Sequence, residues 1–491
     1  MRIPLDRQSP TPLYQQIKSH LKQGILSGGL LPGARLPASR ALARDLGVNR
    51  ITVETAYAEL EADGLVVSRV GSGTYVSASL PVPAQPLTQL EAAWPLWQQS
   101  LRLGGEEDAN VGIDEHLAQM AHPQPVRFAG GSSAPHLFPA DEFRKVLQAV
   151  MRRDGIEALE YGESQGYAPL RATIAHVLAS QGLQARSENI LITAGSQQAL
   201  SLVSQLLLKP GDTLLVESPT YGGALELFRA LRFHVVGVPM DGQGMQVEHL
   251  ERLLQQYHPK LIYTIPNFHN PTGTCLSGSR RRELLLLADR YNVPILEDDF
   301  VGDLRYEGSA QPSLKALDPG GRVIYTNTFS KMLMPGLRVG YLFIEGPLYE
   351  RLVQFKRVND LATSTLIQRA LEAYVTVGRY QAHLRRSCHI FRKRRDAMAA
   401  AIKRYLPASV RFELPQGGLF LWVELPQDVS ADDLLPLACE QGVTFMPGRR
   451  FFPDGLQGRN WMRLNFVVHA PEEIETGVAR LGQALQRLTI R

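Results

Sequence analysis

The sequence predicts an α/β protein in two parts: a small N-terminal unit, and a large domain built on a mostly parallel sheet. Three observations predict this. From about residue 126, short apolar runs alternate with helical patterns, as in parallel sheets covered on both faces. After Val76 comes SASLPVPAQP, whose three prolines cannot continue a helix. Residues 1–79 hold nine Lys/Arg and six Asp/Glu, so a sixth of the chain carries +3 of the net +4.

Composition excludes several classes of protein. The start, MRIPLDRQSP, has no apolar signal region, and no stretch approaches the roughly 18 consecutive apolar residues of a membrane-spanning helix. Cys275, Cys388 and Cys439 are far apart and show neither zinc-site spacing nor a disulfide framework. We therefore expect a cytoplasmic protein of 491 residues with no membrane partner and no metal site.

The first unit, residues 1–79, is predicted to contain three helices and two strands. Apolar residues four apart favour a first helix over 11–28, and Ser39 is a plausible N-cap for a second over 39–48. The third helix, over 49–64, has a buried stripe made of Val53, Ala56, Tyr57 and Leu60. LVVSRVGSGTYVS (65–77) reads as two strands around a glycine-containing turn.

The third helix carries polar residues at its leading end. Asn49 and Arg50 lie there, and Thr52 points away from the buried stripe. Such side chains suit major-groove base edges and phosphates, and Gly71 in the turn would let the backbone approach DNA closely. The alternative is a solvated helical face with ordinary caps.

This unit closely resembles the winged helix-turn-helix domain of GntR-type regulators. The resemblance rests on LPASR (36–40), LARDLGV (42–48), NRITVETAY (49–57), LEADG (60–64) and GSGTYV (71–76). It implies binding to double-stranded operator DNA. The residues it assigns to DNA contact are Arg40, Asn49, Arg50, Thr52 and Gly71.

Residues 80–125 are predicted to be a semi-rigid linker, and residues 126–491 form the large domain. Within it, strands are expected at LLVES, LIYTIP, VPILEDD and VIYTNT, and helices at ALSLVSQLLL and RRRELLLLADRYN. The basic run HLRRSCHIFRKRRDAM (383–398) is expected to be a solvated helix face, with an accessory DNA contact as the alternative.

The strongest chemical signal is TNTFSKMLMPGLRVGY (326–341). An amine that must form a Schiff base needs a fixed, partly desolvated position, and Lys331 follows a predicted strand. Thr328 and Arg338 lie where they can hold a phosphate. The alternative for this segment is a surface Lys and Arg after a strand. In ITAGSQQAL, the free N–H groups near Gly195, Ser196 and Gln197 form an anion site at a helix start, or a simple N-cap.

Three further segments place polar or aromatic groups just beyond predicted strands. Tyr221 in ESPTYGG is suited to stacking on a flat ring, or to the core, and Asn270 lies in the tight loop PNFHNPTG. Asp298 in ILEDDF can keep a pyridine nitrogen protonated, or cap a helix. Strand ends of this kind are where ligands gather in open α/β sheets.

Together these segments resemble fold-type I pyridoxal 5′-phosphate (PLP) aminotransferases over residues 126–488. The resemblance implies a large domain on a mostly parallel sheet with a smaller C-terminal α+β subdomain, and PQGGLFLWVEL (415–425) fits a strand of that subdomain. The resemblance makes Lys331 the Schiff-base lysine, Asp298 the partner of the ring nitrogen and Asn270 a ligand of the ring hydroxyl. It makes Tyr221 the stacking aromatic. It forms the phosphate cradle from Gly195, Ser196, Gln197, Thr328 and Arg338.

The resemblance also assigns two residues outside these segments. Arg463 in WMRLNFV would hold the carboxylate of an effector, and a structural salt bridge is its alternative role. Tyr161 in YGESQGYAPLR would reach the phosphate of the partner subunit. A homodimer, head-to-tail, is implied because the active sites of fold-type I enzymes are built at a dimer interface.

Two positions depart from the family pattern. Where relatives carry a tyrosine that donates to the ring hydroxyl, two residues after the aspartate, this chain has Phe300. The protonated Schiff base should therefore persist to higher pH, which argues against efficient transamination. Gly223 stands where some sensors place an arginine for a distal acid, so a γ-carboxylate effector is disfavoured.

The two units joined by a proline-containing linker resemble the MocR subfamily of GntR-type regulators. The resemblance implies a transcription regulator that senses PLP, or an amino compound reacting with it, and has at most residual transaminase activity. Two alternatives stay open: an authentic aminotransferase with an accessory DNA-binding domain, and a regulator whose large domain is a cofactor-free dimerisation scaffold.

Overall fold

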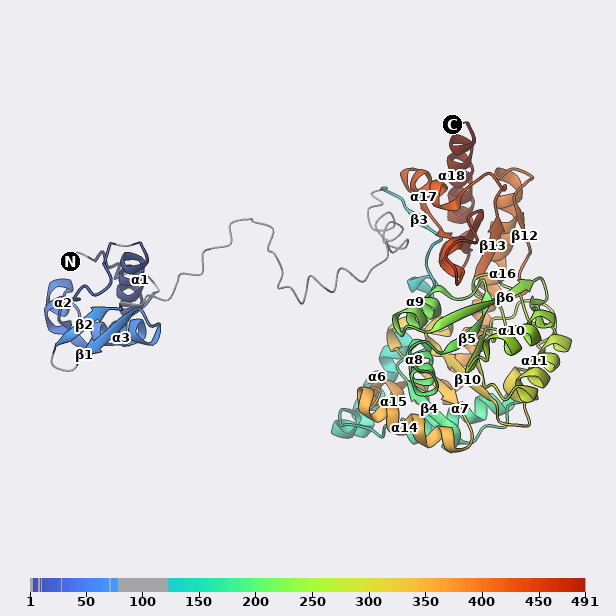
Figure 1. Cartoon of the computed structure of the whole chain (residues 1–491), viewed down its shortest axis with the longest axis horizontal. Coiled ribbons are helices and arrows are strands. Elements are labelled where there is room, and N and C mark those ends of the chain that lie inside the picture. Colours follow the sequence, from blue (N-terminus) through green and yellow to red (C-terminus); the bar gives the residue numbers. More distant parts are fainter. Residues whose placement is uncertain are drawn as a thin grey trace. The chain divides into compact units, whose positions relative to one another are not determined.

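The computed structural model describes residues 3–7, 9, 11–27, 29–69, 72–77 and 122–490. These residues fall into two compact units, one within Met1–Glu106 and one within Glu107–Arg491 (Figure 1). Each unit has its own hydrophobic core. The predicted linker, residues 80–125, lies outside the described residues except for its last four, and Gly71 also lies outside them.

The N-terminal unit consists of three helices and a β-hairpin. They are α1 (Leu13–Leu26), α2 (Ser39–Leu46), α3 (Arg50–Ala62), β1 (Val66–Arg69) and β2 (Gly73–Val76). The predicted stripe of α3 is buried against the other helices. The prediction that Ser39 caps α2 is wrong, because Ala38 occupies the cap position and the Ser39 hydroxyl donates to Glu54 Oε1 at 3.2 Å.

The large unit is built on an eight-stranded sheet in the order β4-β11-β10-β9-β8-β5-β6-β7. The strands pair in parallel except that β11 and β7 run antiparallel to their neighbours, which confirms the predicted fold class. Their bounds are β4 (Ile190–Thr193), β5 (Thr213–Ser218), β6 (His234–Asp241), β7 (Gly244–Met245), β8 (Leu261–Thr264), β9 (Ile295–Asp298), β10 (Val323–Thr328) and β11 (Gly340–Phe343).

Both faces of this sheet are covered by apolar cores. Successive side chains of a strand point to opposite faces, so neighbouring residues enter different cores. On β5, Leu214 and Val216 belong to one core cluster and Leu215 to another, which also contains apolar residues of α10 and α11. The helices from 140 to 376 are α6 (Ala140–Asp154), α7 (Ala168–Ser180), α8 (Ser196–Leu207), α9 (Gly222–Ala230), α10 (Leu250–Tyr257), α11 (Gly278–Arg290), α12 (Leu314–Leu317), α13 (Phe329–Met332), α14 (Pro347–Asp360) and α15 (Thr365–Thr376).

A smaller C-terminal subdomain completes this unit. Its sheet has the order β12-β13-β16-β15, and β3 (Val126–Arg127) pairs in parallel with β14 (Val443–Thr444). The remaining elements are β12 (Arg411–Phe412), β13 (Phe420–Glu424), β15 (Met446–Pro447), β16 (Trp461–Asn465), α16 (Arg379–Tyr405), α17 (Ala431–Glu440) and α18 (Pro471–Ile490).

The basic run at 383–398 lies within α16, but only part of it faces solvent. Arg394 and Arg395 are buried, and Arg395 contacts Glu307 and Asp396 at 2.9 and 2.6 Å. The expectation of a simply solvated face is therefore wrong, because this helix packs against α18 and α15 and its inward arginines find acceptors.

Candidate functional site

Lys331 lies directly after the central strand β10, in the single turn of α13. The Thr328 hydroxyl accepts from the backbone N–H of Ser330 at 3.1 Å and so caps that turn. Burial, together with the nearby guanidinium groups of Arg463 and Arg338, lowers the pKa of Lys331 to about 8. An ordinary lysine has a pKa of about 10.4 and is almost fully protonated near neutral pH. The lower pKa of Lys331 gives it a larger fraction of the nucleophilic free amine.

This pKa gives a testable pH dependence. Only the neutral amine of Lys331 can attack a carbonyl, so attachment of PLP to the apoprotein should accelerate as pH rises and level off above about pH 8. Stopped-flow absorbance after mixing apoprotein with PLP measures the rate, with butylamine in place of protein to correct for titration of PLP itself. If the corrected rate instead has its pH midpoint near the pKa of an ordinary lysine, the Lys331 amine is not desolvated as the structure indicates.

Asp298 ends the neighbouring strand β9 and is fully enclosed. Burial is the main cause that raises its pKa to about 7. Its Oδ2 accepts from the Tyr263 hydroxyl at 3.0 Å, while its Oδ1 is buried without a hydrogen-bond partner. A buried carboxylate oxygen of this kind is stabilised by an N–H donor, so Asp298 has a free acceptor for a protonated ring nitrogen.

The predicted phosphate cradle gathers where α8 begins. Gly195 precedes the helix with φ 96°, and a Cβ there would lie 2.8 Å from Arg338 Nη2. Arg338 donates to Ala194 O at 2.9 Å and approaches Ser330 Oγ at 3.4 Å. Helix N–H groups from Ser196 onward and a guanidinium therefore converge on one place, which suits a phosphate.

Tyr221 and Gln197 line the same region. The Tyr221 hydroxyl donates to Gln197 Oε1 at 3.4 Å, and Gln197 Nε2 donates to Gly223 O at 2.9 Å. A Cβ on Gly223 would lie 2.5 Å from the Tyr221 hydroxyl. A side chain such as arginine at position 223 is therefore incompatible with this position of Tyr221.

Arg463 is buried on β16 of the small subdomain and reaches into the large part of the unit. Its Nη1 donates to Asn270 Oδ1 and its Nη2 to Ala129 O, both at 2.9 Å. The guanidinium also packs on the rings of Phe420 and Phe451, and burial lowers its pKa to about 9. No described carboxylate forms an ion pair with it, so the alternative of a structural salt bridge is not seen here.

Phe300 lies two residues past Asp298 and is 6% exposed, packed in the main core cluster. It supplies no hydrogen-bond donor. The hydroxyl of the nearby Tyr263 is directed to the Asp298 carboxylate.

Tyr161 is not part of this cluster. It lies before α7, is 89% exposed and makes no polar contact with the other candidate residues. Its predicted role toward a partner subunit stays a prediction.

Of the predicted DNA residues that the structure describes, Asn49, Arg50 and Thr52 lie at the start of α3, and Arg40 lies at the start of α2. Asn49 caps α3 by accepting from Ile51 N at 3.0 Å, and the exposed Arg50 pairs with Glu54 at 2.6 Å. Arg40 is exposed and forms no ion pair with another described residue of the chain. At the opposite end of α3, Lys18 and Lys22 of α1 are neutralised by two acids. These pairs are Lys18–Glu59 at 2.9 Å and Lys22–Asp63 at 3.2 Å.

Several residues of these sites are absent from the sequence predictions. Tyr263 and Ser330 adjoin Asp298 and Arg338, and Arg35 and Arg69 flank Tyr75 beside the hairpin turn. Ser330 is adjacent to Lys331 in the sequence, so the prediction of a site at Lys331 could have been extended to Ser330. The other contacts join segments far apart in the chain, and local patterns give no sign of them.

Comparison with known proteins agrees with this geometry. Residues 13–76 match the model of bacterial regulatory proteins of the gntR family, and residues 133–481 match that of class I and II aminotransferases. The chain is 34% identical over 484 residues to the uncharacterized HTH-type transcriptional regulator YisV of Bacillus subtilis, with 98% of each chain covered. It is 33% identical over 479 residues to the HTH-type transcriptional regulator TauR of Rhodobacter capsulatus, with 96% of each covered.

The chain is a MocR-type member of the GntR family. Its large domain also belongs to the class I and II aminotransferases. This domain resembles kynurenine aminotransferase of Pyrococcus horikoshii, with a TM-score of 0.74, 34% identity, and 80% of this chain and 99% of that one covered. The MocR-type chain is also 37% identical over 397 residues to 2-aminoadipate transaminase of Thermus thermophilus, covering 80% of this chain and 98% of that enzyme.

The cofactor of this MocR-type chain is PLP, and the residues around Lys331 fit it. Asp298 Oδ1 is a buried acceptor without a partner, and the start of α8 with Arg338 forms an anion site. Among the described residues, no group of three or more His, Cys, Asp or Glu could hold a metal ion. No helix within the described ranges is both long and apolar enough to cross a membrane.

Proposed function

We propose that this MocR-type chain is a transcription regulator of the cytoplasm. Its winged helix binds operator DNA, and its aminotransferase-like domain senses PLP or an amino compound that reacts with it. One observation carries the proposal: the residues that bind and attach the cofactor are assembled around Lys331, while Phe300 supplies no donor to the ring hydroxyl. Binding is thereby favoured over turnover.

The side chains divide the work of sensing. When bound, PLP supplies a carbonyl that condenses with amines and a ring that withdraws electrons. With its pKa lowered to about 8, Lys331 would provide the attaching amine, and Asp298 would hold a proton at the ring nitrogen. Arg463 donates to the carboxylate of an amino acid, which orients the amine of that compound toward Lys331.

We further propose a head-to-tail homodimer. Large apolar side chains are exposed in the segment that contains Tyr161 and at the end of α14, and contiguous exposed apolar surface marks contact sites. These side chains are Ile156, Leu159, Tyr161, Val358 and Leu361. The two segments are adjacent, since Thr365 donates to Glu160 O at 3.2 Å. A two-fold dimer would present two DNA-reading units to a two-half-site operator.

An operator-binding assay tests the proposal. Full-length protein is titrated onto its own promoter DNA with and without PLP and a panel of amino acids, and an absorbance spectrum of the same sample reports cofactor attachment. We expect the affinity for the promoter to change with the cofactor or with one amino compound. If the affinity for the promoter is the same with every addition while the spectrum shows cofactor attachment, the proposed sensing is wrong and the chain regulates independently of its cofactor.

An authentic aminotransferase is the second candidate, favoured by the retention of Lys331, Asp298 and Arg463 in one cluster. Incubation with amino and keto acids distinguishes it. Many turnovers per site would support an enzyme with a tethering DNA-binding unit. A single conversion of the bound cofactor fits the sensor.

Replacing Arg50 with alanine should weaken specific operator binding by roughly 1–3 kcal/mol if its guanidinium reads a base edge. Arg50 is exposed at the start of α3, held by Glu54 at 2.6 Å. Fluorescence anisotropy with operator and scrambled DNA measures both affinities. Lys22→Ala removes the same charge at the other end of the unit and serves as the control. An equal loss on both DNAs would make Arg50 a phosphate contact.

Replacing Phe300 with tyrosine should restore a donor toward the ring hydroxyl. A donor there stabilises the phenolate, so the pH at which the visible absorbance of lysine-bound PLP changes should fall. A spectrophotometric pH titration of both proteins measures the shift. Phe300→Leu changes the packing without adding a hydroxyl, so a similar fall in that variant would assign the effect to packing.

A further inference from the structure

A cavity of about 1020 Å³ lies between the edge of the large sheet and the small subdomain. We call it the edge cavity. One wall comes from β6 and the loop after Asn270, and the other from β12, β13 and the loop that leads to β16. None of the residues predicted to hold the cofactor lines it. The edge cavity is therefore distinct from the site around Lys331.

The subdomain wall of the edge cavity is aromatic. Trp422 and Trp461 stack with ring centroids 5.3 Å apart and an interplanar angle of 13°, and Phe452 lies beside them. Trp422 and Phe452 are 8% and 7% exposed, so their rings are held by packing. Flat aromatic walls in a cavity of this size are typical of sites for small organic molecules.

The charge around the edge cavity is negative. Asp241, Glu413, Glu424 and Asp454 line it, and Arg411 is the one cation among the described residues of the lining. Glu413 and Glu424 form no ion pair with any residue that the structure describes. Two carboxylates beside aromatic faces suit a cation, because both the charge and the π-system attract it.

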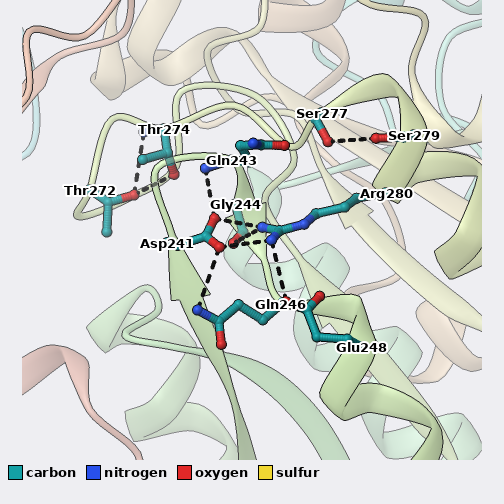
Figure 2. Close-up of polar contacts among 10 residues, drawn as sticks. All are labelled: Asp241, Gln243, Gly244, Gln246, Glu248, Thr272, Thr274, Ser277, Ser279 and Arg280. Carbon is teal, nitrogen blue, oxygen red and sulfur yellow. Dashed lines mark hydrogen bonds and ion pairs between the residues drawn. The ribbon is translucent and has the colours of Figure 1, made fainter.

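The opposite wall is fixed by a polar network (Figure 2). Arg280 holds both oxygens of Asp241, at 2.6 and 2.7 Å, and so joins the end of β6 to the start of α11. Thr272 and Thr274 line the cavity, with their hydroxyls 2.8 Å apart. Asp241 is neutralised by Arg280, and both oxygens of Asp454 accept hydrogen bonds from Leu456 or Gln457, so Glu413 and Glu424 remain the carboxylates available to a ligand.

We propose that the edge cavity is a second ligand site, for a small organic cation with a flat apolar body. The aromatic wall takes the apolar body, and the unpaired carboxylates take the charge. An anionic ligand is disfavoured because the lining carboxylates would repel it.

The edge cavity shares a wall with the site of Arg463. Trp422 is the cross-strand partner of Arg463 in the β13–β16 pair. Its ring packs edge-on against Phe451, with centroids 5.6 Å apart, and Phe451 lies under the guanidinium at 5.0 Å. A ligand on Trp422 is thus two side chains away from Arg463.

Calorimetric titration of full-length, PLP-loaded protein with benzyltrimethylammonium tests the site. This probe has a flat body and a fixed charge, and its nitrogen carries no hydrogen, so it cannot condense with PLP. We expect saturable binding of one probe per chain, and weaker binding of the neutral benzyl alcohol. Glu424→Gln and Trp461→Leu should each weaken binding roughly tenfold.

Glu248→Gln is the matched control, because Glu248 lies near the same wall beside Arg280, at 3.5 Å, but does not line the cavity. It should leave binding unchanged. Absence of saturable binding, equal binding of benzyl alcohol, or binding that survives both Glu424→Gln and Trp461→Leu would each overturn the proposal. The measurement uses neither DNA nor the reaction of PLP, so its failure is separate from failure of the proposed sensor.

Discussion

Replacing Lys331 with alanine is expected to abolish covalent attachment of PLP while leaving the fold intact. Lys331 is half-buried in the short turn after β10, and the chain caps that turn through Thr328 rather than through the lysine. Loss of its Nζ removes the nucleophile, and no other lysine is among the residues assembled there. The visible absorbance of the lysine-bound cofactor should therefore disappear completely.

Two measurements make this prediction sharp. Circular dichroism of Lys331→Ala should match the unmodified protein, which separates chemistry from folding. Lys331→Arg keeps a positive charge but cannot be deprotonated in water, so it should also fail to attach PLP. Retention of the absorbance in either variant would show that the amine comes from elsewhere. If Lys331→Ala loses attachment but keeps PLP-dependent operator binding, sensing does not need the covalent link.

Replacing Arg281 with alanine is expected to destabilise the large unit by about 3–5 kcal/mol. Arg281 in α11 is fully buried, and its guanidinium donates four hydrogen bonds. The acceptors are Leu276 O at 3.0 Å, Pro312 O at 3.0 Å, Pro266 O at 2.8 Å and Asn267 Oδ1 at 2.7 Å. Removal would deprive Leu276 O, Pro312 O and Asn267 Oδ1 of this buried donor, while Pro266 O would keep the backbone N–H of Leu276 at 2.9 Å.

The loss should also reach the cofactor site, because Arg281 joins the two ends of the loop that carries Asn270. Urea unfolding followed by circular dichroism and by cofactor absorbance measures both effects. The neighbouring Arg282 is exposed, so Arg282→Ala should stay within about 0.5 kcal/mol. If Arg281→Ala behaves like Arg282→Ala, the loop is held by other contacts.

Local patterns were sufficient for the elements that bury one clear face. The stripe of α3 from Val53 to Leu60 and the strands before Asp298 and Lys331 were predicted from period and composition, and the structure has them within a residue or two. The candidate residues were predicted to lie just beyond strand ends. Because parallel strands bring these ends to one edge of the sheet, the residues were also expected to lie close together.

Contacts between distant segments could not be predicted in this way. Tyr263 reaches Asp298 from a neighbouring strand, and Arg281 finds acceptors on both sides of a loop. The edge cavity depends on how the small subdomain meets the sheet edge, which no local period encodes. Arg394 and Arg395 were expected on a solvated helix face because the sequence does not show which hydrogen-bond acceptors the fold places beside a charged side chain. In the structure both are buried.

The ion pairs of the N-terminal unit make its charge distribution uneven along α3. Helix α3 has 13 residues and is therefore about 20 Å long. The cations near its far end are cancelled by Glu59 and Asp63, while Arg40 keeps an uncancelled charge near its start. A body with such a charge moment experiences a torque in the field of a polyanion. The unit would therefore rotate its α3 start toward DNA before any side chain touches a base.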